Sequence, residues 1–361
     1  MNTRVSDVRS CDQTQRNARL EEIRDNMLDR IAEAQREGWS GSAMPDDALL
    51  PPAHTDQQFE AVRRDDERLR PGVTAVCERL GLRGLDVTRF PDGSMPIYAV
   101  GDQHVLKLYP NLYRHHGEVE RRVLQAVAGR LPTPTPGVQH AGELDGWGYV
   151  LMDRLHGTSL AAAWPRISQQ GRARLAAQLG ETLAALHATA SPLLTWLGPP
   201  DWDHFILQQR TSCVARQRAA GLDPAWLAQI PAFLDSVALD RGPRLVLLHT
   251  EVMREHLLVT PDADGWSLSG LVDFEPAMRG AREYEFAAVG LFVSRGDAGF
   301  LRRLLIAYGH TPAQLDDALP RRLLAYALLH RYSDLRWYLQ QLPSPPAPTL
   351  DALAACWCGL G

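Results

Sequence analysis

Short apolar runs between residues 85 and 152 constrain the fold of this chain more than any other feature. The segments LDVTRF, MPIYAV and QHVLKLY alternate or carry β-branched residues, and PDGS and GD separate them. Runs of this length between turn sequences predict an antiparallel meander. After a helical segment at residues 112–129, GVQHAG and WGYVLMD predict two more strands joined by a turn at GELDG. We therefore expect about five strands with one helix inserted after the third.

From residue 157 onward the pattern is mainly helical. RARLAAQLGETLAALHA places leucines on one helical stripe. Further helices are predicted at DPAWLAQIPAFLDSV, AREYEFAAVGLFV, DAGFLRRLLIAYG, PAQLDDAL and PRRLLAYALLHRYSDLRWYL, and short strands at HLLVT and WSLSGLVDF. PSPPAP is expected to end the ordered pattern. The predicted fold class is α+β, with a small β-rich lobe followed by a large α-rich lobe.

The N-terminal part predicts an extension in front of these lobes. Apolar residues recur at helical spacing over residues 20–31, and the segment ends in the linker GWSGSAMPDDALLPPA. Residues 56–80 continue helical, with a break or kink expected at Pro71. We therefore expect a helical extension and linker at residues 1–55, a small nucleotide-binding lobe at 56–155 and a large lobe at 156–361.

Composition excludes several classes of protein. A net charge of −5 and a pI near 6.2 give no basic footprint for nucleic acid. No apolar stretch approaches the ~20 residues of a membrane span, and the N-terminus lacks the apolar core of a signal peptide. The five cysteines show neither metal nor disulfide spacing, which favours reduced thiols and a cytoplasmic location. The oligomeric state is left open.

Chemistry-bearing residues gather in LLHTEVMREHLLV, at residues 247–259, and in the following SLSGLVDF. Asp273 ends an apolar strand, where a carboxylate can bind a divalent cation. Glu251 is then suited to orient a hydroxyl nucleophile, which is the division of labour that phosphoryl transfer requires. His249 is expected to fix the backbone by hydrogen bonds rather than to transfer a proton. His256 is left open between a metal ligand and a packed histidine.

The β-rich lobe supplies candidates for binding phosphate. Lys107 lies inside the apolar strand HVLKLY, where an ammonium requires an anionic partner. Glu118 and Glu120 follow in the next predicted helix, and Glu120 lies on its apolar stripe, so we prefer Glu120. The turn PDGS, with Gly93 and Ser94, can bring backbone N–H groups toward phosphate oxygens.

These motifs resemble those of the aminoglycoside phosphotransferase family, whose fold is that of protein kinases. The resemblance covers roughly residues 56–340. HTEVMREH aligns without gaps with the family's H-G-D-x-x-x-x-N loop, which places Glu251 at the catalytic aspartate and His256 at the metal-binding asparagine. VDFE aligns with the second metal-binding strand through Asp273. Lys107 and Glu120 match the family's strand lysine and helix glutamate.

Other segments carry the same resemblance. The segment YVLMDRL resembles the family's hinge, and the resemblance implies that its last four residues bracket adenine: Met152, Asp153, Arg154 and Leu155. GAREYEFA resembles the family's G-D-P-x-x-D-L-A, in which Gly280 aligns with the glycine and Glu285 with the second aspartate. The DQQF…ERLGL segment and the C-terminal helices are most similar to the hygromycin B phosphotransferases. The resemblance implies ATP and Mg²⁺ as cofactors. The imidazole in place of the amide leaves three alternatives open: a weaker metal site, a lost metal site, or a site that prefers a softer ion such as Mn²⁺.

The resemblance implies transfer of the ATP γ-phosphoryl group to a hydroxyl of a small molecule, with a cationic aminoglycoside or aminocyclitol as the expected acceptor and antibiotic resistance as the role. Glu275, Glu283 and Glu285 could line an acidic acceptor pocket, or be surface charges and helix caps.

Glu251 is one methylene longer than aspartate and moves the carboxylate by ~1 Å, a displacement that can cost ~100-fold in rate. Two alternatives therefore stay open: a catalytically impaired pseudokinase that binds nucleotide or ligand, and a kinase with a non-antibiotic acceptor.

Overall fold

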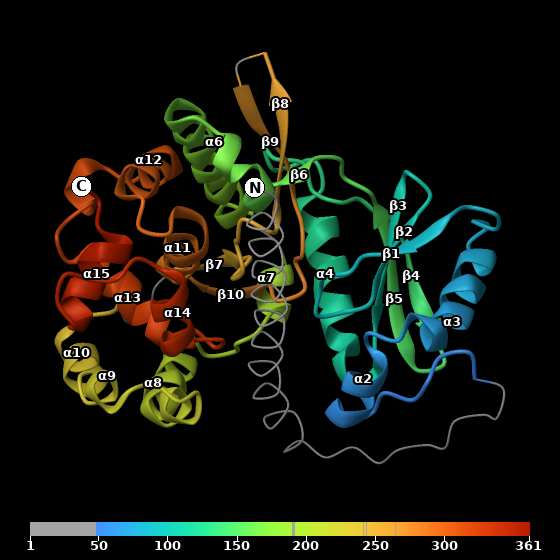
Figure 1. Cartoon of the computed structure of the whole chain (residues 1–361), viewed down its shortest axis with the longest axis horizontal. Coiled ribbons are helices and arrows are strands. Elements are labelled where there is room, and N and C mark those ends of the chain that lie inside the picture. The colour runs from blue at the N-terminus through green and yellow to red at the C-terminus, as the bar shows by residue number, and fades with distance from the viewer. Residues whose placement is uncertain (1–47, 190–191, 241, 243, 264) are drawn as a thin grey trace, which may run out of the picture. The chain divides into compact units, whose positions relative to one another are not determined.

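The structure, a computed structural model, describes residues 48–361 except 190–191, 241, 243 and 264. The chain divides into two compact units (Figure 1). Among the described residues, the N-terminal unit comprises residues 48–117 and 138–154, and the C-terminal unit comprises residues 118–137 and 155–361. The helix predicted at residues 20–31, and most of the predicted extension, lie outside the described residues.

The N-terminal unit contains a five-stranded antiparallel sheet, which confirms the predicted meander. Its strands are β1 Val87–Arg89, β2 Ile97–Val100, β3 His104–Tyr109, β4 Val138–Leu144 and β5 Trp147–Asp153. The spatial order is β1-β2-β3-β5-β4, so β3 lies at the centre. Lys107 on β3 is paired with Ile97 on one side and Val150 on the other, which surrounds the lysine with apolar strands.

Two helices precede this sheet, α2 Asp56–Val62 and α3 Asp66–Arg79. A break at Pro71 is wrong, because α3 continues through Pro71, and the alternative of a kink there stays a prediction. The helical segment is interrupted earlier, where the Asp65 carboxylate accepts a hydrogen bond from the backbone N–H of Arg68 and caps α3. The 3₁₀ turn Asn111–Tyr113 and helix α4 Arg114–Val127 follow β3, as predicted for residues 112–129.

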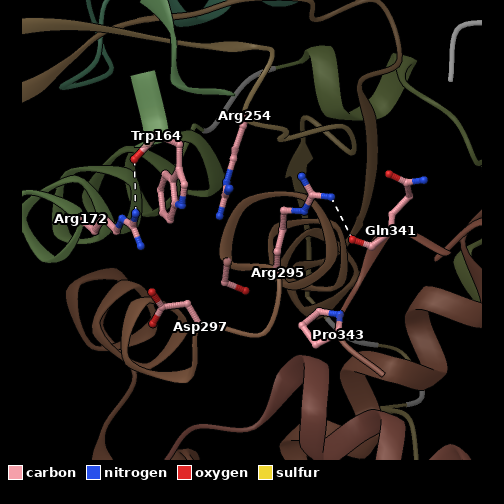
Figure 2. A pocket seen from close by; sticks show the side chains of 8 residues that line it. Trp164, Arg172, Arg254, Arg295, Asp297, Gln341 and Pro343 are labelled. Carbon is pink, nitrogen blue, oxygen red and sulfur yellow. Dashed lines mark hydrogen bonds between the residues drawn. The ribbon is translucent and has the colours of Figure 1, made fainter. Parts of the chain in front are cut away.

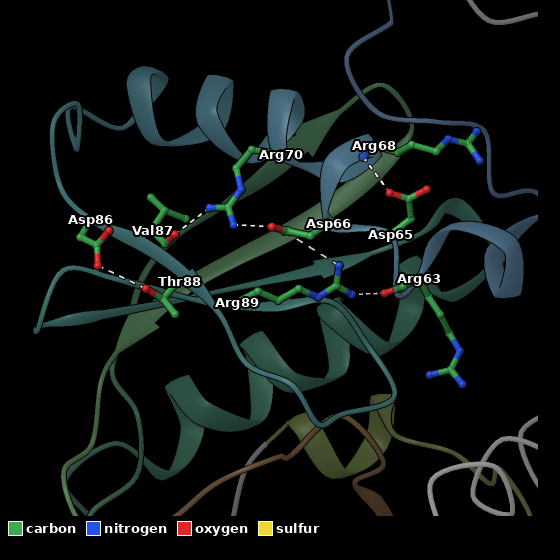
Figure 3. A network of polar contacts seen from close by, with 9 residues as sticks. All are labelled: Arg63, Asp65, Asp66, Arg68, Arg70, Asp86, Val87, Thr88 and Arg89. Carbon is green, nitrogen blue, oxygen red and sulfur yellow. Dashed lines mark hydrogen bonds and ion pairs between the residues drawn. The ribbon is translucent and has the colours of Figure 1, made fainter. Parts of the chain in front are cut away.

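A polar network fixes α3 to the sheet within the N-terminal unit (Figure 3). Asp66 on α3 forms an ion pair with Arg70 one turn later and lies 4.0 Å from a guanidinium nitrogen of Arg89 on β1. Arg70 also donates to the backbone oxygen of Val87, at 2.6 Å. Both arginines lie over the ring of buried Tyr98 on β2, so the network joins α3, β1 and β2.

The C-terminal unit is mainly helical, as predicted (Figure 1). Its helices are α5 Leu160–Ala163, α6 Gln169–His187, α7 Leu193–Trp196, α8 Trp202–Ala219, α9 Pro224–Leu227, α10 Ile230–Ser236, α11 Arg282–Val289, α12 Ala298–Tyr308, α13 Leu319–Leu329, α14 Leu335–Gln341 and α15 Leu350–Cys358, with 3₁₀ turns at Trp164–Arg166 and Pro312–Gln314 and the π-helical turn η4 at Gly290–Ser294. None of the described helices is both long and apolar enough to cross a membrane.

Two small sheets complete this unit. Strand β7 Leu245–Leu248 pairs with β10 Met278–Ala281, and β8 Leu257–Asp262 lies between β6 Thr158–Ser159 and β9 Gly265–Leu271. The strands predicted at HLLVT and WSLSGLVDF are confirmed as β8 and β9. The chain therefore has the predicted α+β class, with a β-sheet lobe and a helical lobe.

Four helical predictions in the C-terminal unit are wrong in detail. DPAWLAQIPAFLDSV, predicted as one helix, forms two helices, α9 and α10. PAQLDDAL forms only a 3₁₀ turn at Pro312–Gln314 before α13 begins. The long segment from Pro320 is two helices, because the Asp334 carboxylate accepts from the backbone N–H of Trp337 and starts α14. Helix α15 follows PSPPAP, where no further order was expected, and Thr349 caps it.

Helices α6 and α12 pack closely at a glycine. A Cβ at Gly180 on α6 would lie 2.3 Å from the backbone oxygen of Leu304 and 2.9 Å from the backbone nitrogen of Tyr308. Backbone atoms cannot move aside as a flexible side chain can. The close packing of α6 and α12 therefore requires glycine at position 180.

Gly180→Ala is expected to destabilise the protein by about 1–3 kcal/mol, since the helices must separate to accept the methyl group. Gly299→Ala is the matched control, because a Cβ at this exposed position of α12 meets nothing closer than 3.5 Å. Chemical denaturation of both variants measures the effect. Equal unfolding midpoints for the two variants would contradict the packing described.

Candidate functional site

Residues 249–256 form a loop that begins directly after β7 and ends directly before β8. Strand β7 is apolar, and Leu247 and Leu248 are buried. Val252 in the middle of the loop is also fully buried, so it anchors the loop to the core. The polar side chains on either side of Val252 are thereby held at defined positions.

A buried carboxylate fixes the start of this loop. Glu285 on α11 is fully buried, and its two oxygens accept hydrogen bonds from the backbone N–H groups of His249, at 2.6 Å, and Thr250, at 2.9 Å. Charge-assisted bonds of this kind are stronger than neutral ones. The suggestion that Glu285 lines an acidic acceptor pocket is wrong, because its side chain is enclosed. Glu283 forms an ion pair with Arg322, at 3.1 Å.

Thr250 is held in an unusual backbone conformation. Its φ is +71°, in the left-handed region that a β-branched residue rarely adopts. The Thr250 hydroxyl donates to the backbone oxygen of Pro276, at 3.0 Å, and Arg331 donates to the same oxygen. Together with the bonds to Glu285, these contacts hold the turn before Glu251 in one conformation despite the strain at Thr250.

His249 joins this loop to the segment after β9. The ring is fully buried, and because a carbonyl oxygen only accepts, Nε2 donates to the backbone oxygen of Val272 at 3.0 Å. Burial is the main cause that lowers the pKa of His249, so the ring is neutral at neutral pH. These contacts agree with the expectation that His249 fixes the backbone.

Asp273 follows β9 by two residues and has a φ of +72°. The next residue, Phe274, packs its ring 4.6 Å from the ring of His249. The backbone N–H of Phe274 donates to Glu120 on α4, at 3.1 Å, and Glu120 is almost fully buried. Glu120 therefore lies beside the segment that carries Asp273, within the C-terminal unit.

Glu251, His256 and Asp273 lie close together, although Asp273 follows β9 and the other two residues lie in the loop before β8. Each offers one ligand atom, and these atoms all lie within 4.8 Å of one another. Nδ1 of His256 lies 2.8 Å from the backbone oxygen of Glu251, and Nε2 lies 3.2 Å from Oδ2 of Asp273. All three side chains are half-buried, so solvent can reach them.

The contacts of His256 determine what its ring can bind. Nδ1 must carry a proton, because the Glu251 carbonyl can only accept. Nε2 then either carries a second proton toward Asp273 or presents its lone pair to a cation that the carboxylate also binds. A histidine that donates one N–H to a backbone carbonyl while the other nitrogen binds metal is a common arrangement in metal sites. The three side chains therefore fit a divalent cation.

The residues predicted to bind the phosphates and adenine belong to the N-terminal unit, except Glu120 and Leu155, which belong to the C-terminal unit. Lys107 is nearly buried on β3, and its Nζ lies 5.5 Å from the centre of the Tyr109 ring. Gly93 adopts a φ of +131° in the turn between β1 and β2, and Ser94 follows it. Their roles toward a nucleotide stay predictions.

The segment at the end of β5 is fixed within the N-terminal unit. Met152 is buried, and Asp153 accepts from the side chain of Gln139 at 2.7 Å. The backbone N–H of Arg154 donates to the backbone oxygen of Gln103, and the guanidinium of Arg154 donates to the backbone oxygen of Gly101 at 3.1 Å.

Sequence reasoning missed two arginines that support the loop. Arg331 holds the Pro276 carbonyl, and Arg254 in the loop donates from Nε to the backbone oxygen of Val293, at 2.8 Å. Only 9% of Arg254 is exposed, and burial lowers its pKa to about 9, so the guanidinium stays charged at neutral pH. The position of Arg254 between Glu251 and His256 was a signal that could have identified it.

Comparison with known proteins assigns the chain to a family. Residues 86–325, well over half of the chain, match the Phosphotransferase enzyme family. The chain therefore belongs to this family of phosphotransferase enzymes.

Solved structures share the fold of this chain. One is the GDP and kanamycin complex of APH(2'')-IIIa, with 18% identity, a TM-score of 0.61, and coverage of 75% of this chain and 92% of that chain. A second is the streptomycin–ATP–APH(2'')-IIa ternary complex, with 15% identity, a TM-score of 0.53, and coverage of 77% and 97%. A third is macrolide 2'-phosphotransferase MphH from Brachybacterium faecium, with 19% identity, a TM-score of 0.53, and coverage of 79% and 97%. The predicted similarity to hygromycin B phosphotransferases in particular stays a prediction.

Glu285→Gln is expected to destabilise the fold by about 1–3 kcal/mol, because the amide NH₂ would face a backbone N–H in place of an acceptor oxygen. Glu283→Gln on the same helix is the control. Its side chain is 17% exposed, and the glutamine oxygen can still accept from Arg322, so the expected loss is about 1 kcal/mol or less. Chemical denaturation gives both values. Hydrogen exchange should also accelerate at the amides of His249 and Thr250 only in the Glu285 variant, and unchanged exchange there would contradict the assigned role.

Proposed function

We propose that this enzyme transfers the γ-phosphoryl group of ATP to a hydroxyl of an aminoglycoside or aminocyclitol, and so inactivates an antibiotic. The observation that carries the proposal is the convergence of Glu251, His256 and Asp273 on a half-buried, solvent-accessible cluster. Phosphoryl transfer requires this combination of an acceptor-orienting carboxylate and cation ligands. The ATP and antibiotic complexes of proteins with the same fold support the choice of donor and acceptor.

Each residue has a proposed role. Glu251 accepts the proton of the acceptor hydroxyl while the new O–P bond forms and ADP leaves with the electrons of the broken bond. Lys107, Glu120 and the backbone at Gly93 and Ser94 position the phosphates. The link from Met152 to Leu155 contacts adenine. His249 holds the loop in place without exchanging a proton, because its ring nitrogen is committed to Val272.

Asp273 and His256 are the proposed ligands of a divalent cation, Mg²⁺ or Mn²⁺. Such a cation neutralises charge on the phosphate oxygens. Magnesium prefers oxygen ligands, whereas manganese accepts an imidazole more readily. The imidazole at position 256 therefore favours Mn²⁺ in this chain.

A binding protein without turnover is the second candidate function. The direct contact between His256 and Asp273, at 3.2 Å, favours it, because an ion pair can satisfy both side chains without a cation. The longer side chain of Glu251 supports the same alternative. Measured turnover separates the two candidates.

Glu251→Gln is expected to lower kcat about 10²–10⁴-fold, because the amide keeps the shape of the carboxylate but cannot accept the proton. ADP release is measured with ATP, Mg²⁺ or Mn²⁺, and a panel of aminoglycosides and macrolides. Glu255→Gln in the same loop is the matched control and should keep near-normal turnover. If ATP stabilises the protein thermally but no acceptor raises ADP release above that of the Glu251 variant, the binding-only alternative replaces the proposal.

His256→Asn is expected to reverse the metal preference. Removal of the imidazole should weaken Mn²⁺ binding about tenfold relative to Mg²⁺, since an oxygen ligand replaces a nitrogen ligand. Electron paramagnetic resonance of Mn²⁺, with Mg²⁺ as competitor and saturating ATP, measures both affinities without turnover. An unchanged ratio of the two affinities would show that His256 is not a ligand.

A further inference from the structure

The C-terminal unit contains a polar cavity, of about 410 Å³, whose lining residues come from segments far apart in sequence (Figure 2). It is lined by Trp164, Arg172, Arg254, Ser294, Arg295, Asp297, Gln341 and Pro343. Three of these residues are arginines. They come from α6, the loop at residues 249–256 and the turn after η4, and Figure 2 shows their side chains around one space.

The arginines are held in place by aromatic and backbone contacts. The guanidinium carbons of Arg254 and Arg172 lie 3.5 Å and 4.4 Å from the centre of the Trp164 ring. Arg172 also donates to the backbone oxygen of Trp164, at 3.3 Å, and Arg295 donates to that of Gln341, at 3.1 Å. Groups held in this way lose little conformational freedom when a ligand binds.

Two of the guanidinium groups keep donors for a ligand. Arg254 is nine-tenths buried, and the only hydrogen bond of its guanidinium among the described residues runs from Nε to the backbone oxygen of Val293. Nε of Arg172 is buried without a hydrogen-bond partner among the described residues. A guanidinium carries five N–H donors, so both arginines can donate further bonds.

The charges that line the cavity specify the ligand. Three arginines face one carboxylate, Asp297, whose Oδ1 already accepts from the backbone N–H of Phe300 and caps α12. The excess of two positive charges matches a dianion. Arginine forks bind phosphate oxygens in pairs, which favours a phosphate group over a single carboxylate. The volume lies in the range of small-molecule sites, which leaves space beyond a bare phosphate.

We propose that this cavity is a binding site for a small molecule with a dianionic phosphate group. The site is distinct from the cluster of Glu251, His256 and Asp273, and it does not depend on the proposed acceptor or donor. The ligand would contact Arg254, which lies on the same loop as Glu251 and His256. The free phosphate ion and an organic phosphate monoester share the recognised chemistry.

Binding of inorganic phosphate, phenyl phosphate and malonate to the full chain tests the proposal by isothermal titration calorimetry. Arg172→Gln and Arg295→Gln are each expected to weaken binding of both phosphates about tenfold or more. Arg303→Gln, at an exposed position of α12 outside the cavity, is the matched control and should bind as the wild type does. A thermal midpoint and a circular dichroism spectrum like those of the wild type show that each variant is folded.

The relative affinities of the two phosphates identify the ligand. Tighter binding of phenyl phosphate identifies a phosphate monoester as the ligand, and equal binding identifies free phosphate, so both results support the site. The proposal is overturned if neither phosphate binds the wild type at about 10 mM, or if the arginine variants bind as tightly as the Arg303 control. Malonate that binds as tightly as the phosphates would also overturn the assignment of ligand class.

Discussion

The carboxylate of Glu285 is the interaction on which the rest of the site depends. It lies inside the C-terminal unit and accepts two backbone N–H groups from the start of the loop, at His249 and Thr250. A buried charge is tolerated only where hydrogen bonds replace the lost water, and here the loop backbone supplies them. The same bonds hold Thr250 in its left-handed conformation and so direct Glu251 toward Asp273.

Much of the fold could be predicted because its signals are local. The meander of β1, β2 and β3 follows from β-branched runs between turns, and the stripe of α6 follows from leucine spacing. Strand β10 could not be predicted, because MRGA has no strand preference and is extended only by pairing with β7. The break before α14 depends on the single cap of Asp334, which a continuous apolar pattern conceals.

The candidate site shows the same division. The loop and VDF predicted a site at Glu251, His256 and Asp273, and the ligand atoms of these residues lie close together in the structure, while their roles stay proposals. The support from Arg331 and the cavity around Arg254 could not be predicted, since they depend on contacts between residues far apart in sequence. The burial of Glu285 also required the structure, because its sequence position alone allowed a surface charge.

The histidine at position 256, which aligns with an asparagine in the family's loop, has a physical consequence in this chain. The ring of His256 is oriented by the carbonyl of Glu251, so its second nitrogen faces Asp273 with either a proton or a lone pair. The most direct test of whether His256 and Asp273 bind a cation is a crystal structure with a non-hydrolysable ATP analogue and Mn²⁺, with anomalous scattering recorded at the manganese edge. The account predicts one manganese peak bound by Nε2 of His256 and a carboxylate oxygen of Asp273. A peak without contact to either residue, with the two still hydrogen-bonded to each other, would contradict it.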